Sequence, residues 1–433
     1  MREQLSTARS TARRKYSAAA AARMITSRAM TAIPIISDAR ALAQFVAALG
    51  RDGWVSVDTE FLRERTFTPK LCLVQLTDGA QSACVDPLAV EDLSPLGELL
   101  ADRSRRKIFH SCRQDLEAID TRLDARAAGL YDTQLAAAFC GHGAQTSYAA
   151  LVEALCDVRL PKAHTRADWS RRPLPRAELE YALDDIKYLQ PLRAILDREM
   201  AVKGYAEWHR EECEYAARPS QYRADPATAW RRIKGVAKLD ATGQSCAQLL
   251  AAWRERRALQ SDRPRNWILP GAVLLTLCRK RPTQLSSLGK IKHIAPGLVK
   301  KSGAQILDLI AQGKRNAPPL APLPPLNAEQ RGQVKRILAR IAEISEQTGI
   351  SQTLIASRPE VEDFTRAVNH TDGAPGMDGT AGTAGANGAD VTAGVAGVDG
   401  AAGVDGADGA AGTRLLQGWR RQLIGEEILT RVL

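Results

Sequence analysis

The hydrophobic pattern of the chain changes along its length. From about Pro34 to residue 217, short apolar runs alternate with stretches in which apolar residues recur every three or four positions. Short runs bounded by turn residues predict buried strands, and the three-to-four spacing predicts amphipathic helices. This part is therefore predicted to be an α/β domain. After residue 218 only the helical spacing continues, which predicts small helical domains.

Within the first part, three successive apolar runs predict an antiparallel meander of strands. They are Trp54–Phe61, Leu71–Leu76 and Ser82–Asp86. Lys107–His110 predicts a fourth strand, and Tyr131–Thr133 predicts a strand end followed by a helix cap. The predicted helices of this domain are Ala39–Leu49, Leu93–Ala101, Gln114–Arg122, Gln134–Cys140, Tyr148–Leu155 and the helical stretch Arg176–Lys203.

The helical region that follows is strongly basic. Between Arg218 and Arg315 the chain has 20 Lys and Arg residues against 5 Asp and Glu, whereas the whole chain carries a formal net charge of +11. Such an excess favours a polyanionic partner. The predicted helices here are Cys246–Leu259, Pro270–Lys280, Thr283–Leu288 and Ser302–Gln312.

A Pro-rich segment, residues 317–326, predicts a stiff linker to a further helical region at 327–433. Its predicted helices are Ala328–Thr348, Gln352–Ile355, Pro359–Ala367, Leu415–Arg421 and Gly425–Leu433. Between them, from Gly373 to Gly412, glycine recurs at every third position with Val391 as the one exception. With Pro375 as its only proline, the repeat at 371–413 predicts a disordered insertion, and collagen-like trimerisation is the alternative.

The remaining composition narrows the class of protein. No run of about eighteen uncharged apolar residues appears, so no membrane span is predicted. The eight cysteines form no C-x-x-C pair, which suits a reducing compartment and leads us to expect a cytoplasmic protein. Residues 1–31 are rich in Ala, Ser, Thr and Arg and only superficially suit a transit peptide. We expect them to be a disordered basic extension outside the fold.

Two acids at the end of the first long strand are the first candidate for chemistry. Side chains alternate between faces along a strand, so Asp58 and Glu60 share one face. Two carboxylates on one face repel each other unless a cation lies between them, and a divalent ion is the usual solution. The alternative is a polar strand end with two solvated acids.

Further acids lie in similar settings. Asp115 follows the strand at Lys107–His110, near a predicted helix start, where the helix dipole alone would also favour an acid. Tyr181 and Asp185 are four residues apart and share one helix face, whereas Asp184 points about 100° away. A tyrosine held by packing and a solvated acid are the alternative for that pair. Together, Asp58, Glu60, Asp115 and Asp185 could hold two divalent ions against a phosphodiester, with Tyr181 orienting the attacking water.

At this point the motifs resemble a known family. Val57–Phe61, His110–Leu116 and Tyr181-x-x-x-Asp185 resemble the three motifs of the DEDD exonucleases, in the subclass with a tyrosine in the last motif. More closely, the chain resembles the bacterial ribonuclease D family from about residue 34 to its end. The segments that carry this closer resemblance are Phe61–Phe67, Leu73–Gln75, Ala167–Leu174 and Leu416–Arg420.

The resemblance implies a fold and a metal site. It implies an RNase H-like exonuclease domain, with a mixed sheet flanked by helices, at residues 32–217. Two small all-α HRDC-type domains would follow at 218–316 and 327–433, the second interrupted by the glycine repeat. Carried over onto matching positions, the family assigns two Mg²⁺ or Mn²⁺ ions per site to Asp58, Glu60, Asp115 and Asp185, and the positioning of water to Tyr181.

The implied activity is metal-dependent 3′→5′ exoribonuclease hydrolysis that releases 5′-mononucleotides from structured RNAs such as tRNA precursors. No obligate protein partner is implied. A DNA 3′→5′ exonuclease and a catalytically silent RNA-binding scaffold are the alternatives. The resemblance of the tail to ribonuclease D disfavours the first, and the presence of all four acids and Tyr181 disfavours the second.

Three other residues are weaker candidates for contact with the terminal nucleotide, by hydrogen bonding or stacking: Phe61, Gln75 and Trp169. For each of them a structural role in packing is the alternative. His110, near Asp115, is a weaker candidate for contact with substrate or metal, with a packing or surface role as its alternative. Asp132, in Tyr131–Thr133, is predicted to cap the helix that follows it.

Overall fold

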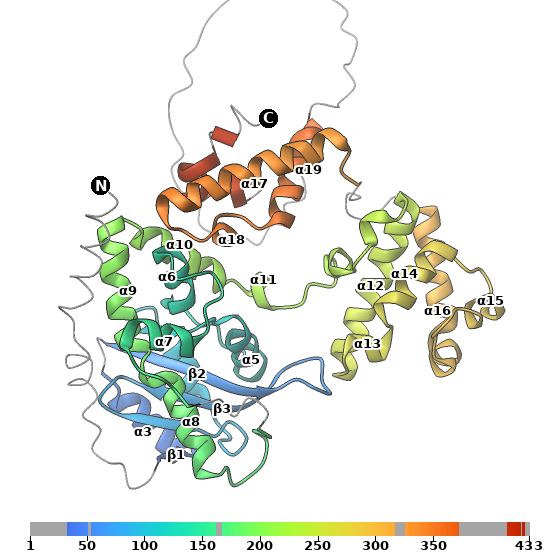
Figure 1. Ribbon diagram of the computed structural model, residues 1–433. Helices are drawn as coiled ribbons and strands as arrows, with labels where there is room; N and C mark the ends of the chain where they lie inside the picture. Colours follow the sequence, from blue (N-terminus) through green and yellow to red (C-terminus); the bar gives the residue numbers. More distant parts are fainter. Residues whose placement is uncertain are drawn as a thin grey trace, which may run out of the picture. The chain divides into compact units, whose positions relative to one another are not determined.

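The computed structural model describes residues 33–50, 53–161, 167–316, 325–371, 414–425 and 427–428 (Figure 1). The chain divides into two compact units, Met1–Pro325 with Ile344–Leu354, and Leu326–Glu343 with Ile355–Leu433. The predictions for residues 1–31, for the linker at 317–324 and for the glycine repeat at 372–413 lie outside the described residues.

Among the described residues, six strands form one sheet in the order β1-β4-β3-β2-β5-β6. The long β2 pairs antiparallel with β3, and β3 with β4, which confirms the predicted meander. The β1–β4, β2–β5 and β5–β6 pairs are parallel, so the sheet is mixed. The strands are β1 Ile35–Ile36, β2 Trp54–Leu62, β3 Lys70–Thr77, β4 Ser82–Val85, β5 Arg106–Phe109 and β6 Leu130–Asp132.

Helices cover both faces of this sheet. The helices of this part are α3 Ala39–Ala48, α4 Ser94–Ala101, α5 Arg113–Leu123, α6 Thr133–Cys140, α7 Tyr148–Cys156, α8 Arg176–Lys187, α9 Leu189–Lys203 and α10 Ala206–Ala216. On one face Val55 and Val57 of β2 join an apolar core with residues of α3, α4 and α5. On the other face Leu73 of β3 packs with Leu179 and Ala182 of α8, which crosses the sheet (Figure 1). The alternation along β2 therefore directs Val57 to the first face and Asp58 to the face covered by α8.

The predicted helical stretch Arg176–Lys203 is two helices, because it breaks at Tyr188. Pro191 explains the break, since proline lacks the N–H that would bond the carbonyl of Lys187 and its ring crowds that carbonyl. The hydroxyl of Tyr148 fills the break by accepting the Tyr188 N–H at 3.0 Å and donating to the Asp184 carbonyl at 2.8 Å. The C-terminal end of α8 is therefore held by a side chain from α7.

The basic middle region is all helical, as predicted. Its elements are α11 Pro219–Tyr222, η1 Ala229–Arg232, η2 Val236–Lys238, α12 Ala241–Ser261, α13 Arg265–Ile268, α14 Gly271–Lys280, α15 Leu285–Gly289 and α16 Pro296–Arg315. They enclose a core that includes Trp230, Leu250 and Ile306, all fully buried. Helix α12 begins five residues before the predicted start because the Asp240 side chain accepts the Gly243 N–H and caps it at that point.

The second unit is described most fully around residues 328–343 of α17 (Ala328–Thr348) and around α19 Arg358–Thr371. The end of α17 and most of the short α18 Gln352–Ile355 belong to the first unit. Near the C-terminus lie η4 Arg414–Leu416, α20 Gly418–Arg420 and η5 Arg421–Gly425. Ile337, Phe364 and Trp419 are fully buried, and the Arg420 guanidinium donates to the Ile355 carbonyl at 2.8 Å. The segments on the two sides of the glycine repeat are therefore in contact.

Candidate active site

Three of the predicted acids converge where β2 passes beneath α8. One carboxylate oxygen each from Asp58, Glu60 and Asp185 lies within 4.8 Å of the others. Asp58 and Glu60 come from the same face of β2, and Asp185 comes from the last turn of the helix that covers that face. The adjacent Asp184 instead lies 3.9 Å from the Lys187 ammonium. The one-residue difference along the helix thus separates an acid of the cluster from an acid of the surface.

Asp115 approaches the same strand from its edge. Strand β5 pairs with β2 only as far as Ser56, so among the described residues no strand covers that edge at Asp58–Glu60. Helix α5 begins four residues after the end of β5, and Asp115 lies in its first turn. Its carboxylate accepts a hydrogen bond from the hydroxyl of Thr59, the residue between the two acids of β2. We call Asp58, Glu60, Asp115 and Asp185 the acid site.

Burial raises the pKa of every carboxyl in the acid site, and repulsion between its acids adds to this for Asp58 and Glu60. Burial raises the pKa of Glu60 to about 8, and the charges of Asp185 and Asp115 add to this. Burial and the neighbouring acids raise the pKa of Asp58 well above its usual range. Burial also raises the pKa of Asp115 to about 7, against the opposing Thr59 hydrogen bond, and that of Asp185 to about 6. Within the described residues, none of the four forms an ion pair with a Lys or Arg side chain.

Tyr181 lies one helical turn before Asp185. Its hydroxyl hydrogen-bonds the Asp185 carboxylate, and burial together with that acid raises the pKa of the phenol. The Trp169 ring lies on its other side, 6.2 Å away between centroids and tilted by 30°. Arg172 holds the segment that carries Trp169, because its guanidinium makes two hydrogen bonds to the Asp86 carboxylate and one to the Cys72 carbonyl.

Comparisons with known proteins agree with this geometry. A family model described as 3'-5' exonuclease matches residues 33–201, and the HRDC domain model matches residues 243–310. The ribonuclease D of Acidiphilium cryptum is 36% identical over 334 residues, which cover 76% of this chain and 85% of that protein. The Escherichia coli ribonuclease D sequence is 34% identical over 325 residues, covering 74% of this chain and 86% of that protein. The solved structure of Escherichia coli ribonuclease D, an exoribonuclease involved in structured RNA processing, has a TM-score of 0.75 at 30% identity and covers 92% of this chain and 98% of that chain.

The chain belongs to the ribonuclease D family. With its exonuclease domain it is a 3′→5′ exoribonuclease, and an HRDC domain follows that domain. In the described part of the chain, no helix is both long and apolar enough to cross a membrane.

For a ribonuclease D, the acid site has the donor set that a hard divalent cation requires. Carboxylate oxygens are the ligands that Mg²⁺ and Mn²⁺ prefer. The three converging oxygens lie close enough to share one ion, and their carboxyl groups form no ion pair with a Lys or Arg among the described residues. The residues present therefore fit a divalent metal centre.

The four weaker substrate candidates lie in different surroundings. Gln75 and Trp169 are buried, so neither offers surface to a nucleotide here. Gln75 lies opposite Asp58 in the β2–β3 register, and both polar atoms of its amide lack a hydrogen-bond partner. Both ring nitrogens of His110 are engaged, one with the Thr133 hydroxyl and one with the Thr146 carbonyl. Phe61 is partly buried against the apolar core on the α5 side of the sheet.

Two residues that position the site were not predicted from the sequence. Thr59 fixes Asp115, and Tyr148 fixes the end of α8. Thr59 lies between the two acids of the motif, and strand alternation directs its side chain away from the face that they share, so the sequence gives no signal for its contact with Asp115. For Tyr148, the only signal in the sequence is its position at the start of the predicted helix Tyr148–Leu155. Asp132 does cap α6, as predicted, and its carboxylate also accepts the N–H groups of Ser111 and Cys112 just before α5.

Proposed function

We propose that Asp58, Glu60, Asp115 and Asp185 hold two Mg²⁺ or Mn²⁺ ions in this 3′→5′ exoribonuclease, and that Tyr181 orients the attacking water. When bound, two divalent ions supply charge stabilisation for both the entering and the leaving oxygen of a phosphodiester. The observation that supports the site most directly is the convergence of three carboxylates without an ion-pair partner among the described residues.

Each residue of the site would have a distinct role. Asp58, Glu60 and Asp185 supply the converging oxygens, and the Thr59 hydroxyl holds Asp115 against the open edge of β2. The raised pKa of the Tyr181 phenol keeps its proton on the hydroxyl at neutral pH. Tyr181 would therefore act as a hydrogen-bonding group that places the water, and not as a phenolate base.

The proposed substrates are the 3′ ends of structured RNAs, with tRNA precursors as one example, and the proposed products are 5′-mononucleotides. The role of the Escherichia coli relative in structured RNA processing supports structured RNA as the class. The basic helical region supports it as well, because Lys and Arg contacts to phosphates dominate affinity for nucleic acids. We also propose that residues 327–433 form a second HRDC-type domain, since Phe364 and Trp419 are both buried and the Arg420 guanidinium donates to the Ile355 carbonyl across the glycine repeat. The site of action is proposed to be the cytoplasm.

The test is to incubate a 3′-extended tRNA with the full chain and Mg²⁺ or Mn²⁺ and to identify the products. We expect 5′-mononucleotides, released stepwise from the 3′ end, and no release after chelation of the metal. Asp58→Asn should abolish release, since it removes one of the three converging carboxylates. Undiminished release by this variant would contradict the assigned site, and cleavage of single-stranded DNA in preference to RNA would favour the DNA exonuclease.

A further inference from the structure

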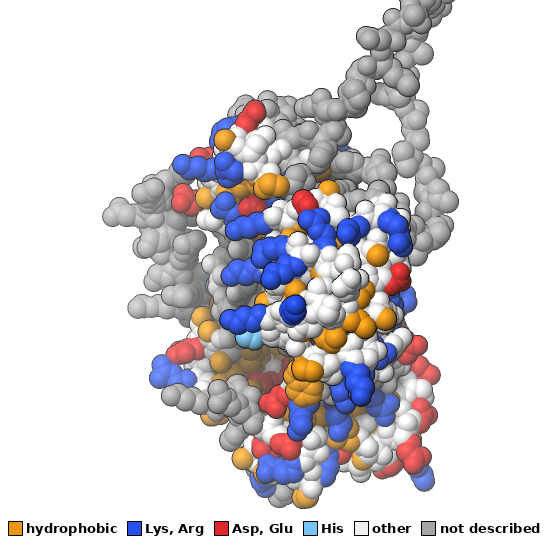
Figure 2. All heavy atoms as spheres, turned by 90° about the vertical axis from the view of Figure 1, so that its right-hand side faces the viewer, with side chains coloured by type: hydrophobic (Ala, Val, Ile, Leu, Met, Phe, Trp, Pro, Cys, Tyr) orange, Lys and Arg blue, Asp and Glu red, His pale blue; other side chains and the backbone are white. Residues whose placement is uncertain are grey.

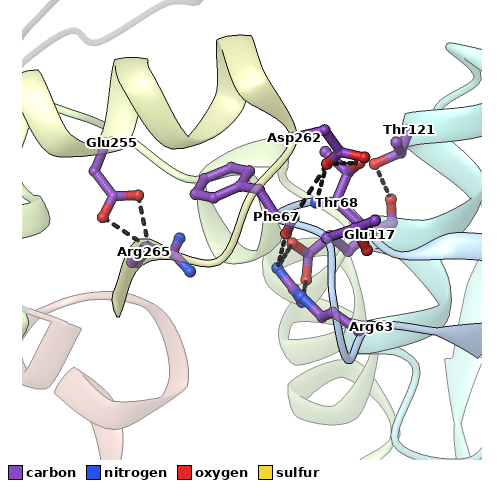
Figure 3. A network of polar contacts seen from close by, with 9 residues as sticks. Arg63, Phe67, Thr68, Glu117, Thr121, Glu255, Asp262 and Arg265 are labelled. Atoms are coloured by element: carbon purple, nitrogen blue, oxygen red, sulfur yellow. Dashed lines mark hydrogen bonds and ion pairs between the residues drawn. The ribbon is translucent and has the colours of Figure 1, made fainter. Parts of the chain in front are cut away.

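The loop between β2 and β3 is anchored on the helical domain. The Asp262 carboxylate, at the end of α12, accepts the backbone N–H groups of Phe67 and Thr68 at 3.1 and 3.0 Å and the Thr68 hydroxyl at 2.8 Å (Figure 3). The Arg265 guanidinium lies over the Phe67 ring, 4.4 Å from its centroid. Asp262 has a φ of +43°, a conformation that few residues other than glycine adopt. Its backbone thus accepts strain in the position that holds the loop.

A cleft of about 860 Å³ opens between this loop and the helical domain. Among the described residues, Glu255 is the only acid in its lining. Six cationic side chains also line it: Arg63, Arg232, Lys234, Arg254, Arg265 and Arg279. We call this the basic cleft. Glu255 is buried and is neutralised by the Arg265 guanidinium at 2.7 Å, with Arg254 3.7 Å away. Arg63 is likewise paired, with Glu117 on α5 at 2.6 Å (Figure 3).

Three cations of the basic cleft are left without an acid. Arg232, Lys234 and Arg279 are exposed, and none forms an ion pair within the described residues. They come from η1, from the segment that follows it and from the last turn of α14, so the fold collects them from separate elements. Figure 2 shows Lys and Arg side chains gathered over the face of this domain. A cleft lined with like charges and apolar walls concentrates its potential on an anion.

The basic cleft is also close to the acid site along the chain. Glu60 lies on β2, and Arg63 follows it by three residues at the start of the anchored loop. Three residues of extended chain span at most about 11 Å. The wall of the basic cleft that contains Arg63 therefore begins within about 11 Å of Glu60.

We propose that the basic cleft binds the phosphate backbone of the RNA substrate a few nucleotides away from the bond being hydrolysed. The inference rests on the proposed function for its ligand, because it takes the strand whose 3′ end lies at the acid site. Arg232, Lys234 and Arg279 are the phosphate contacts. Arg63 and Arg265, already paired with acids, hold the walls of the cleft in place.

The test compares two doubly substituted full-length chains with the wild type on a 3′-extended RNA hairpin. Arg232→Glu with Arg279→Glu reverses two cations of the cleft. Lys280→Glu with Lys300→Glu reverses two exposed lysines of the same domain that do not line it and serves as the control with the same change of net charge. The measurements are KM on the hairpin over a range of salt, the ratio of kcat/KM for the hairpin to that for a dinucleotide, and hairpin affinity in EDTA. Circular dichroism melts confirm that each variant is folded.

We expect the cleft variant to raise KM on the hairpin at least tenfold and to lower the ratio by a similar factor. The slope of log KM against log salt should fall by about 1.4, since each phosphate contact on a single strand contributes about 0.7. The control should change KM by less than about twofold. Equal effects of the two double variants on KM would overturn the assignment. The assignment would also fail if inorganic phosphate bound in the cleft while the two variants bound the hairpin with the same affinity. If the wild type binds the hairpin through the cleft but releases no nucleotide, the proposed function fails and the cleft assignment stands.

Discussion

At the acid site, four carboxylates are enclosed by β2, α5 and α8 with no ion pair to a described Lys or Arg, whereas the basic cleft gathers six cations around one buried acid. In the acid site the ionisable groups are buried, and burial raises their pKa values. The basic cleft leaves its three unpaired cations in solvent, where salt screens them. This difference predicts two kinds of effect. Substitutions in the acid site should remove turnover at every salt concentration, whereas substitutions in the basic cleft should change the affinity for RNA by an amount that depends on the salt concentration.

The largest expected effect comes from the pair of adjacent acids on α8. Asp185→Asn should lower kcat by about 10³-fold, because loss of an ion's charge stabilisation costs several kcal/mol in the transition state. Asp184→Asn is the matched control and should stay within about threefold of wild type, since Asp184 lies beside Lys187. The measurement is kcat of each variant on the RNA hairpin at low and at high salt. Equal losses in the two variants would remove the distinction between cluster and surface acid.

Tyr181→Phe should lower kcat by about 10²-fold, the usual contribution of one positioned proton donor or acceptor. KM should change little, and the slope of log KM against salt should stay as in the wild type. The phenylalanine ring keeps the packing against Trp169. A kcat within twofold of wild type would therefore assign Tyr181 to packing alone.

Thr59→Val should lower kcat by about tenfold, because it frees Asp115 from the hydroxyl that holds it and small displacements of reacting groups are costly. Thr121→Val is the control, since the Thr121 hydroxyl bonds only the Glu117 carbonyl of its own helix, α5. Steady-state rates of the two variants provide the comparison. A loss that is equally large for Thr121→Val would point to α5 stability as the cause.

The smallest effect concerns stability in the absence of metal. The folded protein holds protons on Glu60, Asp115 and Asp185 up to about pH 8, 7 and 6, whereas the unfolded chain releases them near pH 4. The stabilising contribution of the protonated acids is thus present below pH 4 and is lost as the pH rises to about 8. In EDTA, the melting temperature should fall by several degrees between pH 5 and pH 8, and Mn²⁺ should reverse most of the fall. Glu60→Gln should reduce it, and an unchanged dependence in that variant would contradict the assigned cause.

Much of the acid site could be predicted because its parts are local. The alternation of Val57 and Asp58 along one strand, and the four-residue spacing of Tyr181 and Asp185 on one helix, are properties of short segments. The fold around them followed for the same reason, including the meander and the Asp132 cap.

The rest depends on contacts between distant segments. The break at Tyr188 required weighing Pro191 against the helical spacing around it. The Thr59–Asp115 bond joins residues 56 positions apart, and the Thr68–Asp262 bond joins residues 194 apart. The basic cleft exists only because the β2–β3 loop meets the helical domain, so the charge count identified the domain and could not locate the cleft.

The break between α8 and α9 also determines where this chain tolerates insertions. Tyr148 holds the carbonyl of Asp184 and the N–H of Tyr188, which fixes the end of α8. One added residue between Tyr181 and Asp185 would turn the carboxylate by about 100° around the helix axis. Changes of length should therefore be rejected in α8, although the same chain carries a long glycine repeat between Thr371 and Arg414. Within the family, the length of this helix should vary less than that of any loop around it.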